Sequence, residues 1–565
     1  MRKTWRPRTT ALRPDHLESW AAKLCISPRL AGLIWDRGLH TLEQMDAFLC
    51  PGLRHLMPPS AIPGLEDAAR AVAQALVQGR RLTIWGDYDV DGVTSTALMT
   101  DFLTRRGFPA GNYIPARLEE GYGLSSSGLE SLAASGTNMV LTVDCGISAM
   151  QEAERARELG LELVVTDHHL PGPELPRATA IANPKLAENG PGRDLAGVGV
   201  AFFLAAALNR MLPGEPIDVR QFLDLAAMGT LADVVSLTGQ NRILVKNGLL
   251  LLSEAGRPGI FALKEAAGYY PKAPLEASQV TFGMAPRINA AGRLGRADEA
   301  LALLLAPDIE SARPLARALD ELNAKRRQEE DAIAREALEQ AQLQAGQPAM
   351  VLHEPHWHQG VIGIVASRVV DTHYRPTLII TADNGKLRGS GRSIPEVDLH
   401  AAITSCKDLL LGFGGHHQAA GLSLVPENLD LLREAFRKAV HDQLAGTSPS
   451  PSLKLDGELS FSEIHQELLK ELDLLGPFGC GNPEPVFCSG PLDVKARRVF
   501  GANHVMLEVR DPDAKVTLRA KAWRMAGEIG PEVQGKKLKL AFTPRLDTYN
   551  GIASVELRVK DWARE

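Results

Sequence analysis

The chain has 565 residues, of which 45% are hydrophobic and 23% are charged, and its formal net charge is −6 at pH 7. At roughly 100 to 200 residues per domain this length predicts three or four domains, and the negative balance excludes a uniformly basic nucleic-acid binder, so any DNA or RNA must lie in a local basic groove. No apolar run approaches the ~18 residues of a membrane span, and the six cysteines form no CxxC pair, so we expect a cytoplasmic chain without membrane segment, disulfide framework or structural zinc.

From Ala68 onward the sequence alternates between helical and strand-like segments, whereas residues 1 to about 45 are helix-prone and carry no recognisable chemistry. Helices are expected at Ala68–Val77, Thr94–Thr104 and Ala149–Leu159, and strands at Arg81–Trp85, Met139–Val143 and Leu161–Val165. Alternation at this spacing predicts βαβ units and therefore a parallel sheet.

Beyond about residue 195 the pattern is helical, at Ala196–Leu212 and Val219–Gly229. The stretch from Asp308 to Ala345 is rich in good helix formers and is interrupted only by Pro314, so it predicts one long helix that joins two lobes. A second α/β lobe follows, with expected strands at Ala349–His353 and Thr377–Thr381 and a helix at Val361–Val370. Its glycine-rich segments, Gly389–Ser393 and Gly412–His416, are typical of ligand loops.

The polar, turn-rich stretch from Ala445 to Ser452 is the clearest linker in the sequence. After it come short alternating segments at His504–Arg510, Lys515–Trp523, Lys537–Phe542 and Ala553–Val559. Several short strands of this kind predict a small β-barrel, for which a five-stranded nucleic-acid-binding barrel is one candidate.

Four short clusters of acidic residues and histidines carry the chemistry: Asp87–Gly92, Val143–Gly146, Thr166–His169 and Ala232–Val235. Three of them directly follow an expected strand, and open α/β sheets bind their ligands at strand ends. A single Asp-x-Asp would favour a polar turn that caps the next helix. Two further clusters at strand ends favour a divalent-metal site instead.

Asp87, Asp89 and Asp91 alternate, so a chain that stayed extended beyond Trp85 would place them on one face, where they repel unless a cation lies between them. Carboxylates with a few imidazoles suit Mn²⁺ or Mg²⁺, and a pair of such ions can hydrolyse a phosphodiester or a pyrophosphate. The adjacent pair His168 and His169 cannot point the same way from an extended backbone. We assign His168 to the metal and His169 to the substrate phosphate.

These clusters and other motifs resemble the family of phosphoesterases named for an Asp-His-His (DHH) motif, and in particular its bacterial single-strand-specific exonucleases. The resemblance covers the chain from about residue 60 to its end. The motifs are Gly86–Gly92, Arg117–Leu124, Thr142–Gly146, Thr166–Leu170, Leu195–Ala201, Pro286–Arg293, Trp357–Gly363, Gly389–Ser393, Gly414–His416, Ala419–Gly421 and Pro477–Pro485.

The resemblance implies an α/β fold with a DHH catalytic domain at residues 61–250, after an N-terminal helical segment at 1–60. A helical region with the long connecting helix follows at 251–345, a second α/β domain of the DHHA1 type at 346–444, and an OB-type nucleic-acid-binding barrel at 453–565. It also implies a 5′ to 3′ exonuclease for single-stranded DNA in repair and recombination, dependent on Mn²⁺ or Mg²⁺ with two ions.

By motif position, the resemblance assigns metal ligation to Asp89, Asp91, Asp144, His168 and Asp233, and Asp87 would either ligate a metal or orient from close by. The catalytic group would be Asp89, Asp144, His168 and His169.

An exonuclease that starts at a 5′ end needs a pocket for the terminal phosphate, which arginine forks and serine hydroxyls at glycine-rich turns supply. Ser390 and Arg392 are the candidates, with Arg117 from the first lobe, although a solvated turn is the simpler reading of Arg117 alone. Phosphates near the cut would be contacted by Arg287, Asn289 and Arg293. His416 is open to either a substrate or a structural role.

Single-stranded DNA is the expected substrate, and Tyr122, Phe282 and Tyr549 are candidates for stacking on its bases. The resemblance further implies cooperation with single-strand-binding protein and a helicase, and we expect a monomer. Two alternatives remain. A phosphoesterase for a small substrate would not need the linker and barrel, and a non-catalytic DNA clamp would be expected to have lost its acidic ligands.

Overall fold

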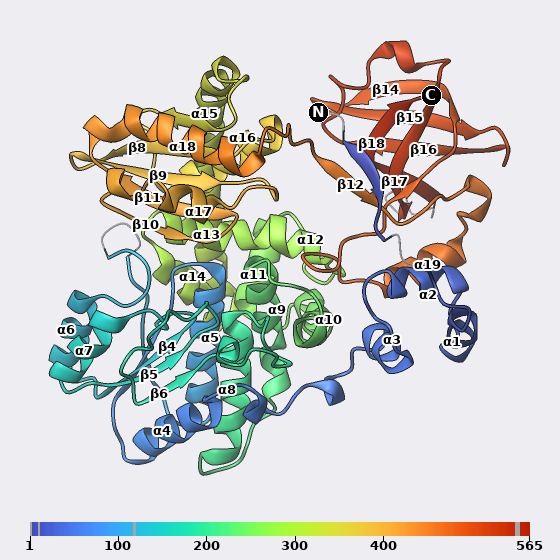
Figure 1. The fold of residues 1–565 in the computed structure, drawn as a ribbon. Helices are drawn as coiled ribbons and strands as arrows, with labels where there is room; N and C mark the ends of the chain where they lie inside the picture. The colour runs from blue at the N-terminus through green and yellow to red at the C-terminus, as the bar shows by residue number, and fades with distance from the viewer. Residues whose placement is uncertain (1–2, 10–11, 117–119, 548–553) are drawn as a thin grey trace. The chain divides into compact units, whose positions relative to one another are not determined.

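The computed structural model describes residues 3–9, 12–116, 120–547 and 554–565 (Figure 1). The chain divides into two compact units. The larger comprises Pro7–Asp320 and Lys454–Glu565, and the smaller comprises Met1–Arg6 and Glu321–Leu453. Among the described residues, no helix combines the length and the apolar character that crossing a membrane requires.

A five-stranded parallel sheet in the order β3-β2-β4-β5-β6 forms the first half of the larger unit. Its strands are β2 (Leu82–Trp85), β3 (Gly111–Tyr113), β4 (Met139–Val143), β5 (Glu162–Thr166) and β6 (Ala180–Ala182). Every residue of β2 and β4 is buried, as expected for a parallel sheet covered on both faces. The helices beside it are α4 (Leu65–Val77), α5 (Val90–Arg105), α6 (Ser126–Ala134), α7 (Met150–Glu158) and α8 (Gly197–Met211). The predicted parallel sheet is confirmed.

Helices follow the sheet in the sequence. They are α9 (Leu223–Ala232), α10 (Gly239–Glu254), α11 (Pro258–Ala266), α12 (Ala277–Gln279), a π-helical turn η5 (Val280–Met284), α13 (Ala285–Arg293) and α14 (Ala297–Leu304). The predicted long helix is confirmed as α15 (Ile309–Leu343), with Pro314 near its start, where the missing N–H removes one helical hydrogen bond without ending the helix. This helix runs from the larger unit into the smaller one.

The smaller unit contains a five-stranded sheet in the order β10-β11-β9-β8-β7. Its strands are β7 (Met350–His353), β8 (Thr377–Asp383), β9 (Lys386–Arg392), β10 (Gly412–Gly415) and β11 (Ala419–Leu424), and its helices are α16 (Ile362–His373), α17 (Leu399–Thr404) and α18 (Leu429–Leu444). Only β7 and β8 are parallel; the other pairs are antiparallel.

The two glycine-rich segments of this unit are strands, so the prediction that they form loops is wrong. Gly389 and Gly391 lie within β9, where a Cβ atom would come 2.9 Å from Leu422 and 2.6 Å from Leu378. The glycines make room for neighbouring apolar side chains. Sequence alone shows only that glycine breaks regular structure, and it does not show the packing that fixes an extended chain here.

The C-terminal part of the larger unit is a closed barrel. Its strands are β14 (Leu492–Phe500), β15 (His504–Asp511), β16 (Val516–Ala522), β17 (Lys537–Asp547) and β18 (Ser554–Arg564). They follow the order β17-β14-β15-β16-β18, and antiparallel pairing of β17 with β18 closes the ring. The short β13 (Phe487–Cys488) adds to β17, and β16 pairs with β18 in parallel. The predicted five-stranded barrel is confirmed.

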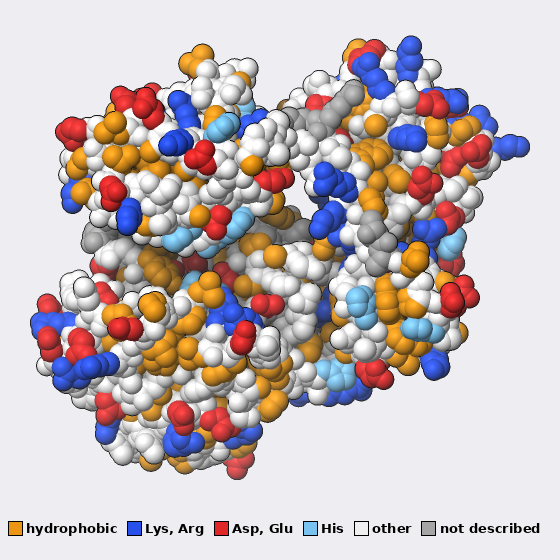
Figure 2. Space-filling view, viewed as in Figure 1, with side chains coloured by type: hydrophobic (Ala, Val, Ile, Leu, Met, Phe, Trp, Pro, Cys, Tyr) orange, Lys and Arg blue, Asp and Glu red, His pale blue; other side chains and the backbone are white. Residues whose placement is uncertain are grey.

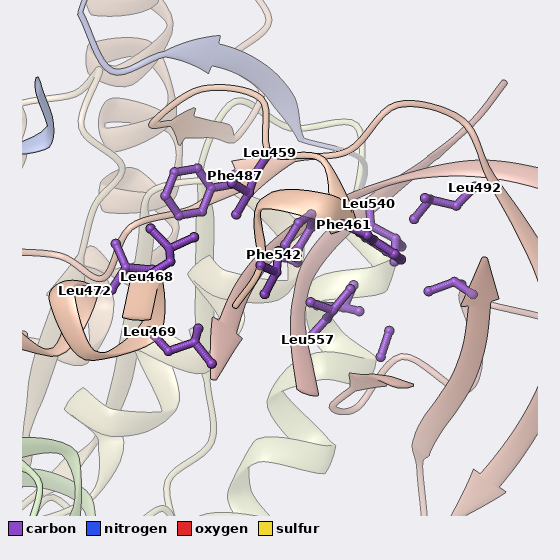
Figure 3. Close-up of a cluster of buried hydrophobic side chains, with 14 of the residues drawn as sticks. Leu459, Phe461, Leu468, Leu469, Leu472, Phe487, Leu492, Leu540, Phe542 and Leu557 are labelled. Atoms are coloured by element: carbon purple, nitrogen blue, oxygen red, sulfur yellow. The ribbon is translucent and has the colours of Figure 1, made fainter. Parts of the chain in front are cut away.

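The barrel core extends beyond its strands (Figure 3). Leucines from α19 (Gln466–Leu474) point toward the same cluster as Phe461, Phe487 and Phe542. Apolar side chains of three N-terminal helices belong to it as well: α1 (Leu17–Lys23), α2 (Pro28–Trp35) and α3 (Leu42–Leu49). The helical segment from Leu17 to Leu49 therefore folds as part of the barrel's hydrophobic core.

One arginine joins the helical layer beside the first sheet to this barrel core. Arg242, in the first turn of α10, is 2% exposed and lies over the Phe48 ring, 3.6 Å from its centroid. Its guanidinium donates to the carbonyl oxygens of Phe48, Leu474 and Leu475 at 2.9, 3.1 and 3.0 Å. These carbonyls lie at the C-terminal ends of α3 and α19, where the helix dipoles favour a cation.

Arg242→Ala should lower the free energy of unfolding by about 3 kcal/mol, because it leaves several buried carbonyls without a donor. Chemical denaturation followed by circular dichroism measures the change. Arg70→Ala, which removes an exposed pair with Asp67, is the control and should cost less than about 1 kcal/mol. Equal effects of the two substitutions would contradict the role of Arg242.

Candidate metal centre

Three acidic or histidine segments lie at one edge of the parallel sheet. Trp85 pairs with Thr142 and Val143 pairs with Thr166, so β2, β4 and β5 end side by side. The residues that follow these ends, Asp87, Asp144 and His168, are all buried. Parallel strands therefore gather side chains that are far apart in the sequence, as open α/β sheets do at their ligand sites.

The Asp87–Asp91 segment does not stay extended, so the prediction that its three carboxylates alternate on one face of an extended chain is wrong. Asp89 is the N-cap of α5, and its carboxylate accepts hydrogen bonds from the backbone N–H groups of Asp91 at 2.9 Å and Gly92 at 3.1 Å. Asp91 lies in the first helical turn and accepts from Gly197 at 2.6 Å and Val198 at 2.9 Å, at the start of α8. The helix begins because Asp89 caps it.

His168 lies among three carboxylates. Its Nε2 atom is 3.1 Å from Asp144 Oδ1, 3.8 Å from Asp91 Oδ2 and 3.7 Å from Asp233 Oδ2. Asp233 comes from the C-terminal end of α9, outside the sheet. Asp144 has a left-handed backbone with φ of 64°, a strained conformation that the packing around it must hold. Ligand atoms from the sheet edge and from α9 therefore lie close together around His168 Nε2.

The donor atoms fit a divalent cation. Within the described residues, Asp144 Oδ1, His168 Nε2 and Asp233 Oδ2 are buried and lack any hydrogen-bond partner. Three groups of described residues have ligand atoms within 4.8 Å of one another: Asp87, Asp89 and Asp144; Asp91, His168 and Asp233; and Asp144, His168 and His169. Buried polar atoms without a partner are costly, and carboxylates with one imidazole are typical ligands of Mn²⁺ or Mg²⁺.

Hydrogen bonding fixes which nitrogen of His168 can bind a metal. Its Nδ1 lies 3.0 Å from the carbonyl oxygen of Leu195, which can only accept, so Nδ1 carries the proton. Burial, with a further contribution from His169, lowers the pKa of His168 to about 3, so the ring is neutral at pH 7. The lone pair of Nε2 therefore faces the carboxylates, as in other metal-ligating histidines.

His169 has the opposite character. Burial lowers its pKa, but the 2.7 Å hydrogen bond from Nδ1 to Asp167 and the charge of Asp167 outweigh burial and raise the pKa above its usual value. Its side chain is 45% exposed, and the Tyr122 hydroxyl lies 3.1 Å from Nδ1. An accessible imidazole whose protonated form is favoured in this way can donate to a phosphate oxygen.

Asp167 is the orienting residue that sequence reasoning missed. Its carboxylate accepts from the backbone N–H groups of His168, His169 and Ile147 as well as from the His169 ring. These hydrogen bonds hold its pKa below the usual value despite burial. Its place as the first residue of the Asp-His-His motif was the available signal.

The three residues of α13 that were predicted to contact phosphate differ in their burial and in their partners within the protein. Asn289 accepts a 3.2 Å hydrogen bond from the backbone of Val90 and so lies beside the acidic turn. Arg287 is 8% exposed, donates to two backbone carbonyls and pairs with Asp320 at 2.8 Å, which commits much of its guanidinium to the protein. Arg293 is partly exposed.

The predicted terminal-phosphate residues lie together in the smaller unit. Arg392 is 3.3 Å from Ser390 Oγ, and both approach Gly363 in the first turn of α16, where a Cβ atom would lie 3.1 Å from the Arg392 guanidinium. His416 lies near them, because its backbone N–H donates to Ala419, which pairs with Arg392 across β11 and β9. Burial and the charge of Arg392 lower the pKa of His416. Arg117 and Tyr549 lie outside the described residues.

Three parts of the chain match known families. Residues 81–230 match the DHH family, N-terminal domain, residues 346–442 match the DHHA1 domain, and residues 455–561 match the RecJ OB domain. The parallel sheet with its acidic and histidine edge thus belongs to a metal-dependent phosphoesterase of the DHH class.

Relatives that match nearly the whole chain show which family within the DHH class it belongs to. The single-stranded-DNA-specific exonuclease RecJ of Dickeya dadantii is 38% identical over 94% of this chain and 95% of its own length. A crystal structure of RecJ from Thermus thermophilus with Mn²⁺ matches 100% of this chain and 80% of that chain, with a TM-score of 0.85 and 33% identity. The same enzyme with Mg²⁺ matches 100% and 78%, with a TM-score of 0.78 and 32% identity. The chain belongs to the RecJ family, and its candidate metal site has the carboxylate and imidazole ligands that Mn²⁺ or Mg²⁺ would take.

Without metal, the centre should make the protein less stable as pH rises. Burial and neighbouring carboxylates raise the pKa of Asp91 to about 7 and of Asp233 to about 9, against about 3.9 in an unfolded chain. These two groups make the metal-free folded state bind more protons than the unfolded state between these values, so they make its free energy of unfolding fall as pH rises. The lowered pKa of His168 opposes this trend only below its ordinary pKa of about 6.5.

Thermal unfolding in chelator from about pH 5 to about pH 9 measures this slope, and Mn²⁺ should restore stability most at the alkaline end because it replaces the lost protons. Asp233→Asn should flatten the slope in chelator. A metal-free protein whose stability rises over this range would contradict the assigned charges.

Proposed function

We propose that the protein is a 5′ to 3′ exonuclease specific for single-stranded DNA. The observation that carries this proposal is the pairing, in one compact unit, of the metal centre around His168 with a barrel of the RecJ OB type. A small substrate would need the centre but not the barrel. The names of the relatives, single-stranded-DNA-specific exonucleases, support the same substrate.

The proposed chemistry is hydrolysis of a phosphodiester with two ions held by Asp87, Asp89, Asp91, Asp144, His168 and Asp233. Such ions, when bound, activate a water and stabilise charge on the phosphoryl group. The chain's own contribution is to hold His168 neutral through Leu195, so that its Nε2 is a ligand. His169, whose protonated form Asp167 favours, donates to a non-bridging oxygen of the scissile phosphate.

The 5′ polarity is proposed to come from the smaller unit. Ser390 and Arg392 face the N-terminal turn of α16, and a hydroxyl, a guanidinium and the N-terminus of a helix together suit a terminal phosphate. His416 would add a donor beside Arg392, while Asn289 and Arg293 would contact phosphates near the cut, with Arg117 and Arg287 as further candidates.

The barrel is proposed to hold the strand beyond the cut. Lys536, Lys537 and Lys539 are exposed on it, and the visible face of the barrel carries Lys and Arg side chains interspersed with Asp and Glu (Figure 2). Tyr122 and Phe282, which are 54% and 75% exposed, offer ring faces for bases. We further propose a cytoplasmic monomer in DNA repair and recombination, supplied with single strands by a helicase and single-strand-binding protein.

Asp144→Asn should lower nuclease activity at least about a thousandfold, because it removes the charge of a carboxylate that stands in two of the three ligand groups and lies 3.1 Å from His168 Nε2. Asparagine tolerates the left-handed backbone at this position, so the fold should persist. Release of nucleotides from a labelled 20-mer with Mn²⁺ measures activity, and circular dichroism checks the fold. A folded variant with full activity would contradict the assignment of Asp144.

Digestion of single strands labelled at either end tests the polarity. The proposal predicts immediate release of a 5′ label, late release of a 3′ label and little attack on a blunt duplex. Arg392→Ala should weaken the preference for a 5′-phosphate over a 5′-hydroxyl by about tenfold or more, since charged hydrogen bonds contribute ~1.5 to 3 kcal/mol. Arg388→Ala, which alters an exposed arginine of the same strand, is the control. Early release of the 3′ label would overturn the proposal.

A further inference from the structure

Asn241, in the first turn of α10, connects two backbone segments of the metal centre. Its side chain is buried, with the residue 2% exposed, and its amide nitrogen donates to the carbonyl oxygens of Asp194 at 2.5 Å and Ser236 at 3.0 Å. An amide nitrogen has two protons, so both are used. Asn241 therefore ties residue 194 to residue 236.

The backbone at residue 194 and the backbone at residue 236 each lie next to the support of one metal ligand. Asp194 precedes Leu195, whose carbonyl oxygen accepts the hydrogen bond that orients the His168 ring. Ser236 lies three residues after Asp233. One side chain thus links the support of His168 to the support of Asp233, whose ligand atoms are 3.7 Å apart.

The segment after Asp233 needs such support. Val234 has φ of 61°, in the left-handed region, which is rare for a β-branched residue and costs of order 1 to 3 kcal/mol. A backbone strained in this way persists only where its surroundings hold it. Without fixed partners at residues 236 and 237, the chain would relax, and Asp233 would move with it.

The second support comes from the loop that follows α19. Leu237 donates its backbone N–H to the carbonyl oxygen of Cys480 at 2.8 Å. A Cβ atom on Gly481 would lie 2.1 Å from Ser236 Oγ, and one on Gly479 would lie 2.7 Å from Leu237 Cδ1. The glycines thus let the loop lie directly against the residues that Asn241 holds.

The neighbouring residue anchors this arrangement to the barrel. Arg242 donates to the ends of α3 and α19, and the Cys480 loop begins directly after α19. Consecutive side chains of one helical turn therefore face in two directions, with Asn241 toward the metal ligands and Arg242 toward the barrel core. The first turn of α10 therefore both attaches the barrel, through Arg242, and supports the metal ligands, through Asn241.

We infer that Asn241 is a positioning residue for metal binding, which holds His168 and Asp233 at the separation that a cation requires, with the Cys480–Gly481 loop as its backing. Outer partners of metal ligands of this kind change metal affinity by about 10- to 100-fold when removed. The barrel attachment consequently contributes to metal affinity, in addition to any role in holding DNA.

The test is Mn²⁺ binding to the full chain by isothermal titration calorimetry without DNA. Asn241→Ala should raise the dissociation constant for Mn²⁺ by about tenfold or more. Asn247→Ala is a matched control, because Asn247 lies on the same helix and its amide also donates to two backbone carbonyls, those of Pro51 and Ile243. It should lose comparable stability and keep the Mn²⁺ affinity of the unaltered protein.

A second pair of variants tests the loop without touching Asn241. Gly481→Ala should weaken Mn²⁺ binding severalfold, and adding Ser236→Ala should restore part of it by removing the crowded hydroxyl. Gly535→Ala controls for backbone strain, because Gly535 also has positive φ, 76° against 70° for Gly481, but a Cβ atom there would meet no atom within 4 Å.

Equal weakening by Asn241→Ala and Asn247→Ala, or unchanged affinity in Asn241→Ala, would overturn the inference. The inference builds on the metal centre of the proposed function, but its readout is independent of DNA. The unaltered protein could bind Mn²⁺ and lose Mn²⁺ affinity with Asn241→Ala, yet fail to digest single-stranded DNA. That result would contradict the proposed nuclease and leave the positioning role of Asn241 intact.

Discussion

Mutual repulsion of buried carboxylates at one edge of the parallel sheet is the constraint on which the rest of this structure depends. Two unit charges about 4 Å apart repel by about 4 kcal/mol at an effective dielectric constant of 20, several times the net gain from one hydrogen bond. Backbone N–H groups at the starts of α5 and α8 offset part of it for Asp89 and Asp91. Asp144 and Asp233 have no comparable donors among the described residues. Only protons or a cation can satisfy them.

The surrounding architecture is arranged to keep these groups together in spite of that repulsion. Parallel pairing of β2, β4 and β5 fixes three of the segments, and Asp233 is brought in from a separate helix. The weakest point is therefore the strained turn after Asp233, and it is held from the helix side by Asn241 and from the barrel side by the Cys480 loop. The barrel and the parallel sheet therefore support the metal centre together. Both belong to the larger compact unit, and the smaller unit is separate from them.

Much of this arrangement could be predicted from sequence, because strand ends and acidic motifs are local signals. The apolar run Met139–Val143 and the acidic residue behind it sufficed to place Asp144. What could not be predicted depends on contacts distant in sequence. Capping by Asp89 bends the chain into α5 at Val90, and apolar neighbours hold Gly389 and Gly391 in a strand. The link from Asn241 to His168 passes through two backbone carbonyls and leaves no pattern in the residues themselves. The predicted domain boundaries stay predictions.

The most direct measurement of the central claim is anomalous diffraction at the manganese edge from crystals of the full chain grown with Mn²⁺. The account predicts anomalous density among Asp87, Asp89 and Asp144 and again beside Asp91, His168 and Asp233, with His168 Nε2 as a ligand. Density only elsewhere on the molecule, or a His168 ring turned so that Nε2 faces away from the carboxylates, would contradict it.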